Sequence, residues 1–357
     1  MRYWMNEIDE INEDERRSAA SGQRFLIFNF FANILQRGIP IYAQNLRIAL
    51  EQEGISCREV RCPLWLTHLP RSLLNLLFVI WEQIVTPLLG ITYQKVIYPY
   101  NSTSILDTLL NRSVLIVHDF IPNAKNRNKF SARYIAATQC IHRALGRTVI
   151  YASFSTQRIG RLLKLFPKSK TFVFPNTFYE FINRLQSNSY IQGNYILLCT
   201  GWGKHKDLKG ALELYRSSGL YLRRNLKILG IAGHQEEVEE FRDNFPEVAG
   251  RIAVLPQLED TEVIRAYKES AWVWVHSRRE GYGRCVAEAK ICGCRTVATD
   301  ILPFREQQNG QVFLYSGLNG FIEAWSKCEM EPVAGTSQEP KEHELLRLEI
   351  RRFLREQ

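Results

Sequence analysis

The sequence predicts an α/β fold built from two doubly wound domains. Short apolar runs alternate with helix-length segments from Arg24 onward, and the runs are continuous in Val, Ile, Leu and Phe, as in parallel strands buried on both faces. The chain has 357 residues, which corresponds to between two and three domains at roughly 150 residues each. A polar segment over 183–193 separates two sets of runs. With 45% hydrophobic residues the chain can bury a sizeable core, which excludes a disordered or fibrous protein.

The first set of apolar runs predicts strands over 24–30, 56–62, 95–99, 113–119, 148–153 and 171–175. Segments with apolar i, i+3, i+4 spacing predict helices between them, over about 40–53, 71–90, 129–146 and 155–165. The second set predicts strands over 195–201, 226–233, 251–256, 272–277, 295–300 and 311–315, again separated by helical segments. Ligands of such sheets bind beyond the carboxyl ends of the strands, so the residues that follow the strands are the candidates for a site.

These runs predict four segments along the chain. They are an acidic tail over 1–23, a Rossmann-like domain over 24–186, a second Rossmann-like domain over 187–326, and a helical tail over 327–357. A charged helix within the last segment carries Leu345, Leu348 and Phe353 on one side. That side could pack back on the first domain.

The charge is concentrated in the body of the chain. Lys and Arg number 46 against 37 Asp and Glu, which gives +9; residues 1–22 carry −3 and residues 329–357 carry −2, so residues 23–328 carry +14. A cationic body favours an anionic ligand or surface: nucleic acid, anionic lipid or a phosphorylated small molecule. Because the sequence has no stripe of basic residues interleaved with aromatic ones, we do not expect nucleic acid as a partner.

Cysteine usage and hydropathy indicate a reduced, cytoplasmic protein. The eight cysteines form no C-x-x-C pair, so no zinc site is expected, and the acidic N-terminus does not resemble a secretory signal. The apolar stretch Leu73–Leu89 is too short for a membrane span and is interrupted by polar residues and a proline. A core helix is favoured over a helix at a membrane interface, since helices that are apolar nearly all round are usually buried.

The strongest functional signal follows the run at 272–277, where the sequence reads RREGYGRCVAE (278–288). Glu280 stands at the end of the predicted strand, and Gly281 and Gly283 permit a tight turn before a helix that begins near Arg284. Glu288 lies about one turn into that helix. Two carboxylates can accept hydrogen bonds from hydroxyl groups, and one plausible ligand is a nucleotide-sugar.

The backbone of the same turn offers donors. The N–H groups of Tyr282 to Cys285, together with the helix dipole, would face an anion or sugar hydroxyls. A diphosphate at the helix end would place the ribose on one glutamate and the hexose on the other.

This segment resembles glycosyltransferase family 4, the retaining nucleotide-sugar transferases of GT-B fold. Their E-x7-E signature typically reads EGFG…LEAMACGTPVVAS, and this chain reads EGYGRCVAEAKICGCRTVATD. The segment GWGKHKDLKGALELY (201–215) resembles the family's strand–loop–helix, with Lys206 at its lysine and His205 at its arginine. LIVHDFIP (115–122) resembles its HD-x-IP turn. The resemblance covers roughly residues 24–325 and implies that the two domains face an interdomain cleft.

The resemblance implies a role for each matching residue. Glu288 would hold the ribose, Glu280 with the Gly281–Arg284 backbone would hold the donor sugar, and Lys206 with His205 would neutralise the diphosphate. In the first domain, the family's pattern assigns His118 to the donor sugar and Gly38 to approaching the diphosphate. Asp119, beside His118, is expected to cap and orient that loop rather than to act as a base. The catalytic candidates are His118, Glu280 and Lys206.

Electrostatics supports these placements independently. A departing nucleoside diphosphate gains negative charge, so cationic side chains and helix N–H groups aimed at it lower the barrier. The sequence has no D-x-D motif, so we expect no metal cofactor, with Lys206 and the helix end in its place. His205 replaces an arginine, and Arg284 stands where the family usually has a small or apolar residue. These departures leave the donor open among GDP-, UDP- and dTDP-hexoses.

The implied activity is retaining, metal-independent transfer of a hexose, with mannose favoured, to a glycan or lipid-linked acceptor. Similar family members act as O-antigen or capsule mannosyltransferases in bacterial lipopolysaccharide and surface-polysaccharide synthesis, which implies a cytoplasmic protein with peripheral contact to the anionic inner face of the membrane. Two alternatives stay open. One is a nucleotide-sugar hydrolase or epimerase of the same fold. The other is a non-catalytic nucleotide-sugar-binding subunit, which the intact Glu280, Glu288, Lys206 and His118 argue against.

Overall fold

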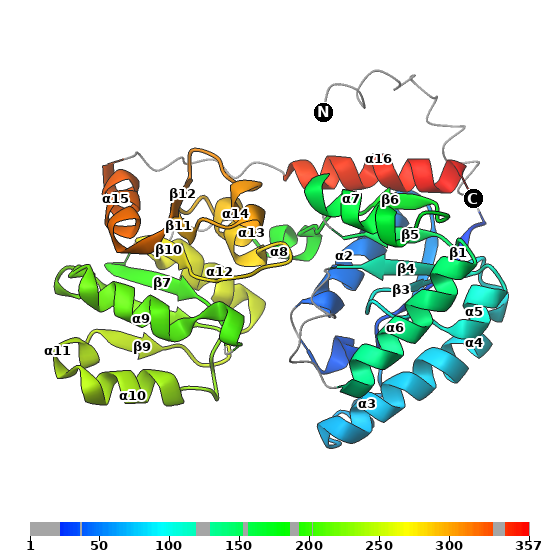
Figure 1. Cartoon of the computed structure of the whole chain (residues 1–357), viewed down its shortest axis with the longest axis horizontal. Coiled ribbons are helices and arrows are strands. Elements are labelled where there is room, and N and C mark those ends of the chain that lie inside the picture. Colours follow the sequence, from blue (N-terminus) through cyan, green and yellow to red (C-terminus); the bar gives the residue numbers. More distant parts are fainter. Residues whose placement is uncertain are drawn as a thin grey trace. The chain divides into compact units, whose positions relative to one another are not determined.

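The computed structural model describes residues 22–35, 38–118, 129–152, 156–185, 193–201, 203–330 and 340–356. The chain divides into two compact units, the first made of Met1–Thr177 with Lys341–Gln357 and the second of Phe178–Pro340. Each unit contains a six-stranded sheet whose neighbouring strands run parallel, with helices packed on it (Figure 1). The predicted architecture of two doubly wound α/β units is confirmed.

The first sheet has the order β2-β1-β3-β4-β5-β6. Its strands are β1 (Arg24–Phe28), β2 (Ser56–Val60), β3 (Lys95–Tyr98), β4 (Ser113–Val117), β5 (Val149–Tyr151) and β6 (Thr171–Val173). Every residue of β4 is buried, as expected for a central strand covered on both faces. Each of these strands falls within one of the predicted apolar runs.

Helices surround this sheet and carry the connections between its strands. They are α2 (Ile39–Gln52), α3 (Arg71–Ile80), the π-helical turn η4 (Trp81–Val85), α4 (Thr86–Leu89), α5 (Ile105–Leu109), α6 (Lys129–Ala144), α7 (Thr156–Leu165) and α16 (Lys341–Arg355). The described residues of this unit also form the short 3-10 turns η2 (Phe30–Asn33), η3 (Leu64–Leu66) and η5 (Gly90–Thr92).

The last helix, α16, packs on the first unit. The Phe353 ring meets the rings of Phe25 and Phe172 at centroid distances of 5.9 and 5.2 Å. Arg351 donates two hydrogen bonds to the Glu53 carboxylate, at 2.7 and 3.0 Å. Residues near the end of the chain therefore belong to the first unit and pack against its sheet.

The buried row of α16 differs from the predicted one. Leu346, Ile350 and Phe353 are buried, whereas Leu345 and Leu348 are only half-buried. Steps of four and three residues follow the helical repeat and place the first three on one face. The assignment of Phe353 was right and that of the two leucines was wrong, because the charged helix has apolar residues on two adjacent rows.

The second sheet has the order β12-β11-β10-β7-β8-β9. Its strands are β7 (Tyr195–Cys199), β8 (Asn225–Leu229), β9 (Ile252–Val254), β10 (Trp272–Val275), β11 (Thr296–Thr299) and β12 (Val312–Tyr315). The helices are α8 (Tyr179–Asn183), α9 (Leu208–Ser217), α10 (Glu236–Asn244), α11 (Pro246–Ala249), α12 (Asp260–Glu269), α13 (Arg284–Ile291), α14 (Leu302–Arg305) and α15 (Gly317–Met330), with 3-10 turns η7 (Lys204–Lys206) and η8 (Leu220–Leu222). Trp272 and Trp274 are both buried in its core.

The apolar stretch in the first unit forms a continuous helix, Arg71–Thr92, from α3 through η4 and α4 to η5. By length and composition it is the one helix among the described residues that could cross a membrane. Only 28% of its most apolar stretch is buried inside the protein. The expectation of a buried core helix is therefore wrong for most of its surface, and only one of its faces packs on the unit.

That inner face carries a buried acid. Glu82 lies in η4, is fully buried, and accepts hydrogen bonds from the Ser102 hydroxyl at 2.7 Å and from the Tyr134 hydroxyl. Burial raises the pKa of the Glu82 carboxyl to about 7, and the hydrogen bonds from these hydroxyls offset only part of that rise. A carboxyl with such a pKa makes the stability of the first unit depend on pH.

We predict that Glu82→Gln flattens that dependence. The folded-state pKa lies above the unfolded value of 4.5, so the stabilising contribution of this group is present below pH 4.5 and is lost as pH rises to about 7. The wild-type chain should lose up to about 3 kcal/mol relative to Glu82→Gln between pH 4.5 and 8. Urea unfolding across this range measures it, with the exposed Glu344→Gln as a control that keeps the wild-type profile. A Glu82→Gln profile parallel to the wild type would contradict the assignment.

Candidate functional site

The two loops that carry the motif residues meet because β7 and β10 are neighbours in the second sheet. They pair in parallel, with Cys199 opposite Val275, so both chains leave the sheet at the same edge. The chain after β7 leads to η7, and the chain after β10 leads to Gly283 and α13. The two loops are also tied together, since the His205 carbonyl accepts hydrogen bonds from the Arg278 N–H at 2.7 Å and the Ser277 hydroxyl at 3.1 Å.

Lys206 and Glu280, predicted from separate segments, form an ion pair across these loops. The Lys206 Nζ lies 2.5 Å from the Glu280 Oε1, and both side chains are largely buried. Burial lowers the pKa of the Lys206 ammonium, but the Glu280 carboxylate outweighs it and holds that pKa above its ordinary value. Lys206 is therefore a fixed positive charge at neutral pH. His205 differs from it, because its side chain is exposed.

Asp207 fixes the backbone between η7 and α9. It adopts the left-handed conformation at φ 51°, and its carboxylate accepts two hydrogen bonds from the Arg278 guanidinium, at 2.7 and 2.8 Å. Burial alone would raise the pKa of Asp207, but the hydrogen bonds from Arg278 and His276 lower it overall. The turn that presents Lys206 is thus held by a carboxylate that the sequence analysis did not identify.

His276 has a structural role. Its Nε2 lies 3.3 Å from the Asp207 Oδ2 and its Nδ1 2.5 Å from the Tyr315 hydroxyl, which also accepts a hydrogen bond from the Trp274 indole. A carboxylate only accepts hydrogen bonds, so the ring proton belongs on Nε2 and Tyr315 donates to Nδ1. Burial lowers the pKa of His276. His276 therefore packs at the end of β10.

The amino end of α13 is held by close packing. Gly283 caps it at φ 85°, and a Cβ at this position would lie 2.4 Å from the Phe304 ring. The Gln307 side-chain amide donates to the Tyr282 carbonyl, and the buried Tyr282 ring lies 6.2 Å from the Phe178 ring. The helix dipole places partial positive charge at this end, beside Lys206 and Glu280.

Glu288 lies in the second turn of α13 and is 8% exposed. Its Oε2 accepts a hydrogen bond from the Tyr267 hydroxyl at 3.2 Å, and its Oε1 lies 3.4 Å from the Arg284 Nε. The Arg284 guanidinium also lies 4.5 Å from the centre of the Phe178 ring. The carboxylate is therefore directed toward the amino end of its own helix.

Sequence reasoning missed Tyr267 and Phe178. Tyr267 lies in α12, and nothing in its local pattern indicates a hydrogen bond to Glu288. Phe178 immediately precedes α8, far from the motif in sequence. Both contacts arise only when the helices pack around β10, so no short-range signal could have identified them.

In the first unit, His118 directly follows β4. Its backbone N–H donates to the Asn101 Oδ1 at 2.9 Å, its ring hydrogen-bonds the Pro99 backbone, and the Tyr42 ring lies edge-on at 4.6 Å. The Nε2 is buried and has no hydrogen-bond partner among the described residues. Burial lowers the pKa of His118 to about 4, so the imidazole is neutral at pH 7 and Nε2 is an acceptor.

Gly38 lies at the same edge of the first sheet as His118. It caps α2 at φ 77°, and Tyr42 in the first turns of α2 contacts the His118 ring. Asp119, expected to orient this loop, lies outside the described residues. In the second unit, the structure thus brings Lys206 and Glu280 to the amino end of α13, the helix that contains Glu288. In the first unit, it brings Gly38 and His118 to the same edge of the sheet.

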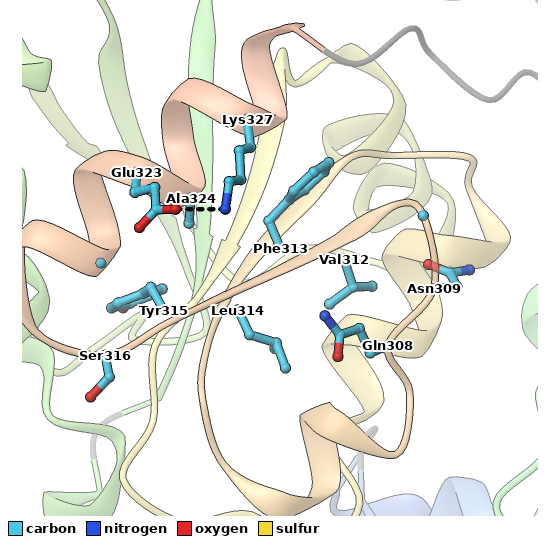
Figure 2. Close-up of a pocket in the computed structure, with 12 residues that line it drawn as sticks. Gln308, Asn309, Val312, Phe313, Leu314, Tyr315, Ser316, Glu323, Ala324 and Lys327 are labelled. Carbon is cyan, nitrogen blue, oxygen red and sulfur yellow. Dashed lines mark hydrogen bonds and ion pairs between the residues drawn. The ribbon is translucent and has the colours of Figure 1, made fainter.

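A hollow of about 520 Å³ lies elsewhere in the second unit, along β12 and α15. Figure 2 shows Glu323 and Lys327 of α15 on one side of it, joined by an ion pair of 2.6 Å, with Phe313 and Tyr315 of β12 nearby. None of Lys206, Glu280 or Glu288 lines it. This hollow is therefore not part of the candidate site.

We predict that Gly283→Ala disrupts the amino end of α13. Alanine costs roughly 1–2 kcal/mol in the left-handed conformation, and overpacking against Phe304 adds roughly 1–3 kcal/mol. The matched control is Gly250→Ala, since a Cβ there meets no atom within 4 Å and the backbone is right-handed. Chemical denaturation should show a loss for Gly283→Ala alone. Equal stabilities of the two variants would show that the close packing at Gly283 is not needed.

No curated protein sequence matches the chain. Residues 182–326, which include both motif loops, match the family model of "Glycosyl transferases group 1". Among solved structures, sucrose-phosphate synthase from Thermosynechococcus elongatus is similar at TM-score 0.67 and 13% identity, over 94% of this chain and 98% of that one.

Two further solved structures are similar over nearly their whole length. HepE of Anabaena, in complex with UDP and glucose, has TM-score 0.58 at 16% identity, over 94% of this chain and 95% of that one. A Listeria monocytogenes protein described as a UDP-N-acetylglucosamine 2-epimerase has TM-score 0.60 at 15% identity, over 95% and 98%. The chain has the GT-B fold of these structures, and the match to the group 1 family model falls within its second unit.

Proposed function

We propose that the protein transfers a hexose from a nucleoside-diphosphate sugar to a carbohydrate or lipid-linked glycan acceptor, with retention of the anomeric configuration. The observation that carries the proposal is the arrangement of Lys206, Glu280 and Glu288 at the amino end of α13. This arrangement lies within the region that matches the group 1 family model. A fixed cation, a helix end and two carboxylates suit a ligand that has a diphosphate and several hydroxyl groups.

Lys206 would bind the diphosphate. In the free protein its charge is neutralised by Glu280, and a diphosphate with more than one negative charge competes for the same ammonium group. The released Glu280 then accepts hydrogen bonds from hydroxyls of the donor sugar. As the glycosidic bond breaks, charge develops on the leaving diphosphate beside Lys206 and the dipole of α13, which lowers the barrier. On this account the reaction uses no metal cofactor.

Glu288 would hold the ribose of the donor. The hydrogen bond from Tyr267 fixes one carboxylate oxygen and orients the group, while Arg284 lies beside the other. Arg284 is the residue most able to select among donors, because it combines a charge next to Glu288 with a fixed position on Phe178. GDP-, UDP- and dTDP-hexoses are the candidate donors.

In the first unit, His118 would accept a hydrogen bond from a sugar hydroxyl. Its buried Nε2, which has no hydrogen-bond partner in the described part of the chain, has the acceptor character that this role needs, and its backbone is held by Asn101. Gly38 would allow the backbone before α2 to approach a phosphate closely, since glycine has no side chain. Asp119 keeps its proposed orienting role.

The sequence resemblance to O-antigen and capsule transferases supports a place in bacterial surface-polysaccharide synthesis. We propose mannose as the favoured hexose and a lipid-linked or growing glycan as the acceptor. The enzyme would then act in the cytoplasm, at the inner face of the cell membrane, where such acceptors are presented.

A second candidate function is epimerisation or hydrolysis of a nucleotide-sugar, which the likeness to the Listeria protein favours at the level of fold. Incubation of the protein with a donor, first alone and then with a glycan acceptor, separates the two. With the acceptor present, a transferase should release nucleoside diphosphate and form glycosylated acceptor in equal amounts. With the donor alone, it should release little free sugar. Comparable release of free sugar or an epimer in both incubations would support the second function.

We predict that Lys206→Ala weakens donor binding at least tenfold, because a hydrogen bond to a charged group contributes roughly 1.5–3 kcal/mol. A thermal-shift titration with GDP-, UDP- and dTDP-sugars measures it, since a bound donor stabilises the protein by mass action. Each variant is compared with its own ligand-free melting temperature, which removes the effect of the unpaired Glu280.

The matched control is Lys209→Ala, one turn further along in α9 with an exposed side chain. It should keep the wild-type affinity, and Glu288→Gln should lose affinity as Lys206→Ala does. If Lys206→Ala and Glu288→Gln bind donor like the wild type, the proposed site is wrong.

A further inference from the structure

We propose that the outer face of the helix Arg71–Thr92 docks, lying in the plane, on the surface of an anionic lipid bilayer. We call "the apolar face" the exposed residues Leu76, Ile84, Leu88 and Ile91 of this helix. The inference deepens the proposed function and rests on it in one respect: a lipid-linked acceptor would be presented at such a surface.

The apolar face is continuous because the π-helical turn corrects the helical register. The inward residues recur every fourth position, at Leu74, Phe78, Glu82, Thr86 and Gly90, and the outward row at 76, 80, 84 and 88 has the same spacing. In a regular α-helix a spacing of four drifts around the axis. The π-helical turn η4 has more residues per turn than an α-helix, which offsets this drift and keeps each row on its own side of the helix.

Packing of the inner face keeps this helix along the protein. The Phe78 ring lies 5.2 Å from the Phe28 ring, and the Trp81 ring lies 6.0 Å from the Phe30 ring. A membrane-spanning orientation would remove these rings and the buried, hydrogen-bonded Glu82 from the unit. The 22 residues instead offer a ridge of about 33 Å at 1.5 Å per residue.

Neighbouring elements extend the apolar surface. Gln83 accepts a hydrogen bond from the Ile105 N–H, which places the exposed leucines of α5 beside the helix. The Tyr134 hydroxyl donates to Glu82, and the Phe130 ring of α6 stacks on Tyr134, so Phe130 lies beside the helix as well. Figure 1 shows α3 and α4 at the outer edge of the first unit, with α5 and α6 beside them. Of the twenty large apolar side chains that the described residues expose, thirteen fall between Leu64 and Phe130.

The charge around this surface is one-sided. Residues 60–179 contain fifteen Lys and Arg and three acids, Glu82, Asp107 and Asp119. Glu82 and Asp107 are fully buried, and Asp119 lies outside the described residues. The described part of this segment therefore exposes no carboxylate, while Arg71 and Arg133 are exposed at the start of α3 and on α6.

This combination favours a bilayer over a protein partner or a second copy of the chain. A bilayer with anionic headgroups takes up apolar side chains along a whole ridge and attracts basic residues at its rim without requiring complementary acids. A second copy of this chain would bring a like charge to the same face. Trp65, 75% exposed in the turn before α3, suits the headgroup region, where an apolar ring with a polar N–H is favoured.

Flotation of the full chain with vesicles tests the proposal. Wild-type protein should float with phosphatidylcholine–phosphatidylglycerol vesicles at low salt, less at high salt, and at least tenfold less with phosphatidylcholine alone. The double variant Ile84→Gln/Leu88→Gln should lose at least tenfold in partitioning. The control Leu222→Gln/Met330→Gln changes two apolar residues of the second unit that are more exposed than Ile84 and Leu88, and it should float like the wild type.

Further outcomes would overturn the proposal. These are no flotation of the wild type with anionic vesicles, equal flotation of both double variants, or a concentration-dependent dimer that Ile84→Gln/Leu88→Gln abolishes while flotation is unchanged. Donor-dependent thermal shifts of the same variants should equal the wild type, because the changed residues lie outside the donor site. A failure of the surface is thereby distinguished from a failure of the proposed transferase.

Discussion

The candidate site depends on the parallel pairing of β7 with β10. Each strand is a continuous apolar run that is buried along its length, so the pair is fixed at the centre of the second sheet. The pairing delivers two loops to one edge, where Lys206 from one meets Glu280 from the other. Asp207 and Arg278 tie the same two loops together on the solvent side. The charges at the site are thus placed by sheet geometry and then held by ion pairs.

The two units differ in where their charged side chains lie. In the second unit the cation at the site is partly buried, and its ion pair with Glu280 holds it in position. In the first unit, the segment 60–179 keeps its acids buried and leaves its basic residues at the surface. The cationic body seen in the composition therefore has two parts: a small, ordered one at the proposed donor site and a larger, diffuse one around the apolar face.

Much of the fold could be predicted from the sequence, because parallel strands buried on both faces produce continuous apolar runs with helical segments between them. The E-x7-E pattern likewise placed Glu280 between β10 and the helix α13, and Glu288 inside that helix. What could not be predicted depends on contacts between distant residues. Packing decides the hydrogen bond from Tyr267 to Glu288 and the contact of Arg284 with the Phe178 ring. It also decides that Leu346 of α16 is buried rather than Leu345. The exposure of Ile84 and Leu88 was missed for the same reason, since composition alone does not say which face of an apolar helix is covered.

The most direct test of the account is a crystal structure of the chain with a nucleoside-diphosphate sugar bound. The account predicts the diphosphate within hydrogen-bond distance of the Lys206 Nζ and the amino end of α13, the ribose hydroxyls on Glu288, and the Lys206–Glu280 ion pair broken. A diphosphate bound away from these residues, with that ion pair intact, would contradict it.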